Sequence, residues 1–296
     1  MKSLTLAALL VVVLGCAGPA ATPRPGGGPL MVVTTTTVFG DLVKQVGGDR
    51  VEVHSLVPRG GEVHTFDPAP SDAVALNRAR LLILNGLGLD DWLLSFAQQA
   101  GADGIPLLAL GENLEGVQYL EGAQAFNPHL WMSPAYARLY VDRIRLKLGE
   151  IDPAGQAAYD VNADAYDQRL AELDAWVAQQ LGAVPAERRK VVSFHDAFPY
   201  FARAYGIEIV GVVVEAPGQD PSAAEVVRLV QAIRAAGVSA ILTETQFNPD
   251  VAQTIAAETG AAVVGGLYTD TLGDSPIDTY EAAIRFDVEQ IRAALE

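Results

Sequence analysis

The chain has a single cysteine, Cys16, so no disulfide bond can form within it. Basic residues are also scarce: 20 Lys and Arg stand against 36 Asp and Glu, which gives a formal net charge of −16. Nucleic-acid binding is therefore not expected, because no basic surplus is present to neutralise phosphates. The composition is nevertheless globular, with 50% hydrophobic and 19% charged residues, and a chain of 296 residues can form two domains.

The N-terminus holds an unbroken run of apolar and small residues at 4–15, with Thr5 at its edge. It is too short for a transmembrane helix, which needs roughly 20 residues, and it suits the apolar core of a secretory signal. The run ends in Val-Leu-Gly-Cys, which resembles a bacterial lipobox. We therefore expect a signal peptide at 1–15, a diacylglycerol thioether on Cys16 and a flexible tether at 16–29. An ordinary signal peptide with an incidental cysteine is the alternative.

Strand and helix patterns alternate along the rest of the chain, which indicates an α/β architecture. Strands are expected at 30–35, 51–57, 81–85, 106–110, 190–194, 208–214, 239–243 and 261–265. A short helix is expected at 71–80 with Ser71 as its N-cap, and a capping box at Ser222 and Glu225 opens another.

A much longer helical pattern runs over 153–181, where apolar residues recur every three or four positions. At 1.5 Å per residue this helix would span roughly 40 Å, the height of a whole domain. It is either one long helix of a single domain or a rigid strut between two lobes. The strand–helix units on both sides favour two Rossmann-like α/β lobes, at 30–150 and 185–296, joined by a linking helix within 151–184.

Only four histidines are present, and three of them share a setting. His64, His129 and His195 each lie at a strand-to-helix connection, as does Asp270. Ligands of open α/β sheets bind beyond the carboxyl ends of the strands, so these side chains could meet between the lobes. Spacing alone also allows each histidine to be an ordinary hydrogen-bonded residue. His54 alternates with strand residues and is expected at the surface or an edge.

The sequences around these residues resemble the zinc- and manganese-specific substrate-binding proteins of ABC transporters, the ZnuA/TroA type. The matching motifs are VPRGGEVHTFDPAPSD at 57–72, NGLGLDDW at 85–92, NPHLWMSP at 127–134, SFHDAFPYFARAYG at 193–206, EAPGQDPSAAE at 215–225, TETQF at 243–247 and LYTDTLG at 267–273. The resemblance implies two lobes joined by a rigid helix, with the metal in the cleft between them. It also implies that His64, His129, His195 and Asp270 are the metal ligands.

The same resemblance implies a monomeric, extracytoplasmic protein that delivers its metal to the permease and ATPase of an importer. Three imidazoles and one carboxylate suit zinc, and His195 stands where manganese proteins of the family tend to have Glu. The stretch 111–127 lacks the His-rich loop of many zinc members, so manganese and iron stay open. Glu62, Asp196 and Glu244 are candidates for orienting the imidazoles. Because histidine must be neutral to bind metal, affinity should fall below about pH 6.

Two rival functions remain at this point. A zinc hydrolase would need an open coordination position and a general base, whereas four protein ligands close the shell, and neither HExxH nor GxSxG occurs. A bilobal binding protein for iron chelates would use other site residues. We therefore expect a transport protein and not an enzyme.

Overall fold

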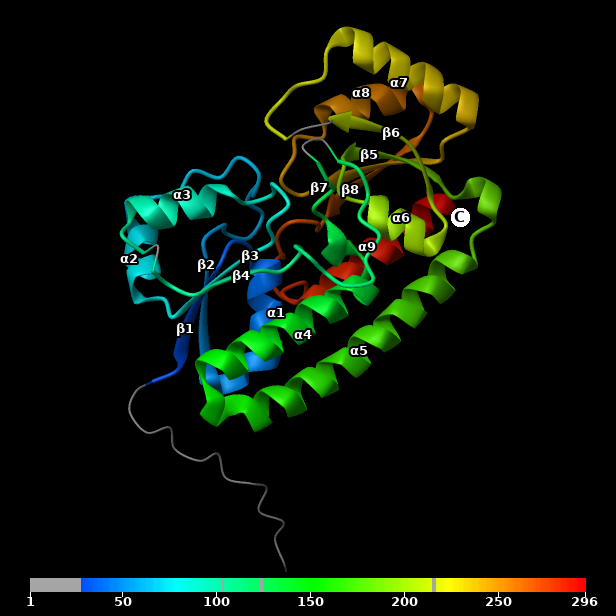
Figure 1. Cartoon of the computed structure of the whole chain (residues 1–296). Helices are drawn as coiled ribbons and strands as arrows, with labels where there is room; N and C mark the ends of the chain where they lie inside the picture. The colour runs from blue at the N-terminus through cyan, green and yellow to red at the C-terminus, as the bar shows by residue number, and fades with distance from the viewer. Residues whose placement is uncertain (1–27, 103, 123–124, 215–216) are drawn as a thin grey trace, which may run out of the picture.

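The computed structural model describes residues 28–102, 104–122, 125–214 and 217–296. The expected signal peptide, Cys16 and nearly all of the tether lie outside these residues. Within the described ranges, no helix is long and apolar enough to cross a membrane. The fold consists of two α/β lobes with a long helix running beside both (Figure 1).

The N-terminal lobe is built on a four-stranded parallel sheet of order β2-β1-β3-β4. Its strands are β1 (Leu30–Thr34), β2 (Val51–Ser55), β3 (Leu81–Leu84) and β4 (Leu107–Ala109). Its helices are α1 (Thr37–Gly47), α2 (Pro70–Arg78) and α3 (Trp92–Gln99). Leu82 and Leu84 pack against α2 and α3, whereas Leu81 and Ile83 belong to the core on the other side of the sheet. Burial on both faces explains why β3 is entirely apolar.

The C-terminal lobe repeats this topology in the order β6-β5-β7-β8, again all parallel. Its strands are β5 (Lys190–His195), β6 (Glu208–Val214), β7 (Ala240–Glu244) and β8 (Ala262–Leu267). Its helices are α6 (Pro199–Tyr205), α7 (Ala223–Ala236), α8 (Asp250–Thr259) and α9 (Tyr280–Leu295). In both lobes the strands, numbered along the chain, lie side by side in the order second, first, third, fourth, so the two sheets have the same topology.

Helices α4 (Pro134–Ile151) and α5 (Gln156–Gly182) connect the lobes. The 27 residues of α5 correspond to about 40 Å of helix. Its buried residues are those of the predicted periodicity: Tyr159, Ala163, Tyr166, Leu170, Leu173, Val177 and Leu181. They share one apolar core with α1 and α4 on one side and with α6 and α9 on the other. The long helix therefore packs against both lobes, which supports a strut.

One helix start differs from the prediction. Helix α2 begins at Pro70 with Ala69 as its N-cap, so Ser71 lies inside the first turn and is not the cap. Proline is favoured at the first helical position and holds the residue before it in an extended conformation, which moves the start upstream. The carboxylate of Asp72 then accepts the Ala69 N–H at 2.8 Å. The capping box of Ser222 and Glu225 at α7 is present as predicted.

Candidate metal centre

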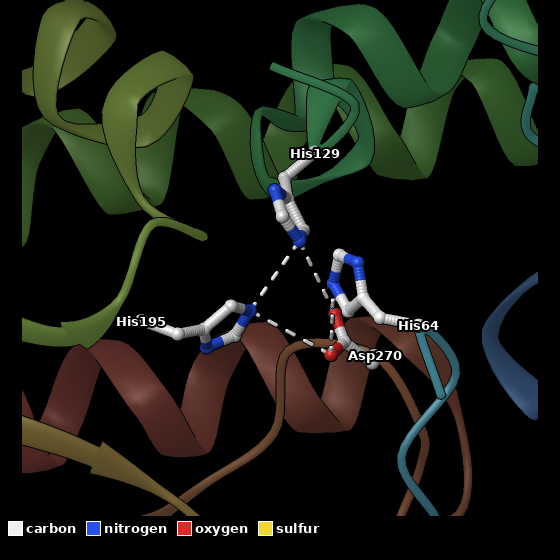
Figure 2. Close-up of side chains that lie close together, drawn as sticks. All are labelled: His64, His129, His195 and Asp270. Carbon is white, nitrogen blue, oxygen red and sulfur yellow. Dashed lines mark hydrogen bonds and ion pairs between the residues drawn. The ribbon is translucent and has the colours of Figure 1, made fainter. Parts of the chain in front are cut away.

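The structure brings His64, His129, His195 and Asp270 together between the lobes (Figure 2). His64 lies in the loop after β2, and His129 precedes the 3-10 turn η2 (Leu130–Met132). His195 is the last residue of β5, and Asp270 follows β8. One ligand atom from each residue can be chosen so that all four lie within 4.8 Å of one another. His54, by contrast, is exposed on the edge strand β2.

The distances between these atoms fit a small four-coordinate shell. His129 Nε2 lies 3.4 Å from His195 Nε2 and 3.6 Å from Asp270 Oδ1. Asp270 Oδ2 lies 3.7 Å from His195 Nε2 and 4.0 Å from His64 Nε2. In a tetrahedron with bonds of about 2.1 Å, ligand atoms are about 3.4 Å apart. A small contraction of this arrangement would therefore hold one ion.

Two atoms of the set are buried without a hydrogen-bond partner in the described part of the chain, His64 Nε2 and Asp270 Oδ1. Buried polar atoms are nearly always paired, so such atoms indicate a bound group. Asp270 is fully buried, and His129 and His195 are almost so, whereas the His64 side chain keeps 17% of its surface exposed. His64 is thus the corner of the site nearest to solvent.

The imidazole of His129 is oriented by Asn127, which the sequence analysis did not single out. Asn127 Oδ1 accepts the His129 backbone N–H at 3.0 Å and lies 3.1 Å from Nδ1. Its Nδ2 donates to the carbonyl and the carboxylate of Asp196, at 2.6 and 2.9 Å. With a proton on Nδ1, the Nε2 lone pair of His129 is free to bind a metal.

The other two buried residues of the set have partners at the last residue of β7 and in the turn that follows it. His195 Nδ1 lies 2.9 Å from the buried carboxylate of Glu244. Gln246 donates to Asp270 Oδ2 at 3.0 Å, a second contact that the sequence analysis missed. Asn127 lies in the motif NPHLWMSP and Gln246 in TETQF, and these positions are the sequence feature that could have identified them as partners of the ligands.

Glu62 acts on the backbone of the loop. Its carboxylate accepts the N–H groups of His64 and Thr65, at 2.8 and 2.9 Å, and the Thr65 hydroxyl at 2.6 Å. These bonds fix the turn that carries His64.

The protonation of the site is uneven. Burial, reinforced by the nearby His195, lowers the pKa of His64 to about 3 and that of His129 well below its ordinary value. Burial also opposes protonation of His195, but the Glu244 and Asp270 carboxylates outweigh it and raise that pKa to about 9. Burial raises the pKa of Asp270 to about 7. Near neutral pH, the imidazoles of His64 and His129 are therefore neutral, whereas His195 beside Asp270 still holds a proton.

Two similar α/β lobes, with a helix packed along both, form the architecture of a bilobal solute-binding protein, and the His3Asp set between them is its candidate metal site. A family model described as "Zinc-uptake complex component A periplasmic" (ZnuA) matches residues 32–294. The chain belongs to this family, which comprises the metal-binding substrate-binding proteins of ABC importers and not enzymes.

Individual relatives agree with this assignment. The chain is 29% identical to the manganese-binding lipoprotein MntA of Halalkalibacterium halodurans, over 99% of this chain and 97% of MntA. It is 32% identical to the iron-binding protein YfeA of Yersinia pestis, over 88% and 84% of the two chains. Its structure is similar to the periplasmic zinc binding protein TroA of Treponema pallidum, with a TM-score of 0.82, 27% identity and coverage of 91% and 99%. These three relatives are named for three different metals.

Proposed function

We propose that this protein captures one zinc ion with His64, His129, His195 and Asp270 and delivers it to an ABC importer. The observation that supports this most directly is the convergence of the four ligand atoms within 4.8 Å, two from each lobe. Once His195 has released its proton, the Asp270 carboxylate can balance part of the ion's charge, and together with the three imidazoles it can surround the ion without water. The ion is the cargo of the protein.

The choice of zinc rests on the donor set and on the ligand distances. Imidazole suits zinc, and the affinity order of divalent ions places zinc well above manganese at the same ligands. The distances of 3.4–3.7 Å among His129 Nε2, His195 Nε2 and the two Asp270 oxygens are close to the edge of a zinc tetrahedron. His64 Nε2 lies slightly farther away, 4.0 Å from Asp270 Oδ2. Manganese is the first alternative, because the manganese-binding lipoprotein MntA aligns with 99% of this chain. Iron is the second, because the iron-binding protein YfeA aligns with 88% of it.

We further propose that the mature chain acts as a monomer outside the cytoplasm, held to the membrane by lipid on Cys16. The lipobox resemblance supports this, and MntA is named a lipoprotein. Its partners would be the permease and the ATPase of a metal importer.

Elemental analysis of the purified mature protein tests the proposal, followed by competition between zinc and manganese. We expect one zinc per chain, loss of the ion in His195→Ala, and a shift toward manganese in His195→Glu. His54→Ala is the matched control, since this fourth histidine is exposed on β2 and should leave metal content unchanged. A wild-type protein that binds no transition metal stoichiometrically would contradict the proposal.

A further inference from the structure

Helix α6 of the C-terminal lobe contacts the part of the N-terminal lobe that leads to His129. Two segments there, 120–122 and 125–127, run antiparallel. Asn127 N donates to Leu120 O at 2.8 Å, Gly122 N donates to Ala125 O at 3.4 Å, and Glu121 and Phe126 form the bridge between them.

In such a ladder, residues 120 and 127 should exchange two hydrogen bonds. The bond from Asn127 N to Leu120 O is present, but the reciprocal bond from Leu120 N to Asn127 O is replaced by a side chain from the other lobe. The Leu120 N–H donates to the Tyr200 hydroxyl at 3.0 Å, and this hydroxyl donates to the Asn127 carbonyl at 2.9 Å. Tyr200 is 1% exposed, so no solvent competes strongly for its hydroxyl. The C-terminal lobe thus completes a ladder of the N-terminal lobe.

Arg203, one turn further along α6, adds an exposed contact to the same region. It donates to the Gln118 carbonyl at 3.0 Å and to the Tyr136 hydroxyl at 2.7 Å. Its guanidinium also lies over the Tyr200 ring, 5.4 Å from the centroid. Both side chains therefore bind the N-terminal lobe from one face of one short helix.

The contact leads directly to the metal site. Asn127 is held through its carbonyl by Tyr200, and its side chain holds His129. A movement of α6 away from the N-terminal lobe would pull on Asn127, and through it on the His129 imidazole. The connection continues across the lobes, because the Asn127 amide also donates to Asp196, the neighbour of His195.

We propose that Tyr200 is a positioning residue. The two hydrogen bonds of its hydroxyl, which we call the latch, hold α6 against the N-terminal lobe and set the rate at which the metal is released. This inference rests on the proposed function of the site. Tyr200 is not a ligand, and it acts through Asn127 on His129. Loops on the other side of the site also join the lobes, as where Gly60 N donates to Thr271 Oγ1 at 3.0 Å. Loss of the latch should therefore loosen the site without abolishing it.

The test compares Tyr200→Phe with Tyr205→Phe. Tyr205 lies on the same helix, but its hydroxyl donates to the Asp174 carboxylate of α5 at 2.6 Å, so its loss removes a hydroxyl hydrogen bond that does not reach segments 120–122 and 125–127. Each protein is loaded with zinc, and release is followed by stopped flow into an excess of chelator. Trp131, whose ring lies 5.2 Å from that of His129, supplies a fluorescence signal.

We expect release to be about tenfold faster in Tyr200→Phe, a factor that corresponds to about 1.4 kcal/mol, with zinc association unchanged. Tyr205→Phe should stay within about twofold of the wild type, although it too loses a hydroxyl hydrogen bond of the folded state, the one to Asp174. Hydrogen exchange of the Leu120 amide should accelerate only in Tyr200→Phe. Equal release rates in the two variants would overturn the latch while leaving the proposed function intact.

Arg203→Gln is a second variant for the same test. Because Arg203 is exposed, this substitution leaves no cavity in the core that would unfold the protein. It should accelerate release by about twofold to threefold, because exposed contacts contribute less than buried ones. No change in this variant, together with an unfolded Tyr200→Phe protein, would count against the latch. A wild-type protein that holds no zinc would instead remove the proposed function and the latch together.

Discussion

Glu244→Gln should weaken zinc binding by about 30-fold at pH 7. Glu244 is 2% exposed, and its Oε1 lies 2.9 Å from His195 Nδ1. Glutamine has the same shape, and its amide oxygen can still accept a hydrogen bond from the His195 Nδ1–H. The substitution therefore removes the negative charge and little else.

Two opposing effects determine the size of this change. A carboxylate about 7 Å from a divalent ion attracts it by about 5 kcal/mol at an effective dielectric constant of about 20. The same charge, together with that of Asp270, raises the pKa of His195 to about 9, so the metal must displace a proton at pH 7, and removing Glu244 relieves up to about 3 kcal/mol of that cost. The difference, about 2 kcal/mol, corresponds to about 30-fold and lies within the 10–100-fold range of such partners.

Competition titration against a chelator of known zinc affinity measures the effect. Glu62→Gln is the matched control, because the Glu62 carboxylate binds the backbone at His64 and Thr65. Its affinity should fall only severalfold. Wild-type affinity in Glu244→Gln, or a larger loss in Glu62→Gln, would refute the reasoning that the charge behind His195 strengthens metal binding.

Three further predictions concern pH, the strut and the lobes. Because His195 has a pKa of about 9 and must lose its proton to bind metal, zinc affinity should rise with pH, by about tenfold per unit near pH 8. The rise should be steeper between pH 6 and 7, where Asp270, with a pKa of about 7, must also lose a proton; a flat titration profile would contradict this. The fall thus begins well above the pH 6 expected from an unperturbed histidine. Leu170→Ala, at a fully buried position of α5, should lower the free energy of unfolding by about 2–5 kcal/mol, whereas Val161→Ala, 68% exposed on the same helix, should change it by less than about 0.5 kcal/mol in urea titrations. Small-angle scattering should show only a small change in radius between metal-free and metal-bound protein, since α5 packs against both lobes; a large change would show that α5 does not restrain them.

The strands and the long helix were predictable because burial leaves a pattern in the sequence. The four apolar residues of β3 and the seven buried positions of α5 are such patterns. Ser71 shows the limit of local rules, because a cap depends on where the helix starts and Pro70 moved that start.

The candidate ligands could be found because each follows a strand and stands in a family motif. Their partners were harder to find. Asn127 and Gln246 carry no charge and form no periodic pattern, so only the folded loops reveal that they hold His129 and Asp270. Tyr200 was hidden for the same reason, since its hydroxyl bonds to backbone groups about 80 residues away in the chain.

The division of the site between two similar lobes explains why contacts far from the ion should matter. Each lobe supplies two of the four candidate ligands, so neither lobe can complete a four-coordinate shell alone. Under the proposed function, affinity therefore depends on how far apart the lobes are held. Helix α5 restrains that separation from one side, and Tyr200 of α6 joins the lobes beside His129. Cargo release then requires a displacement at one corner of the shell, and the contacts between the lobes determine how readily it occurs.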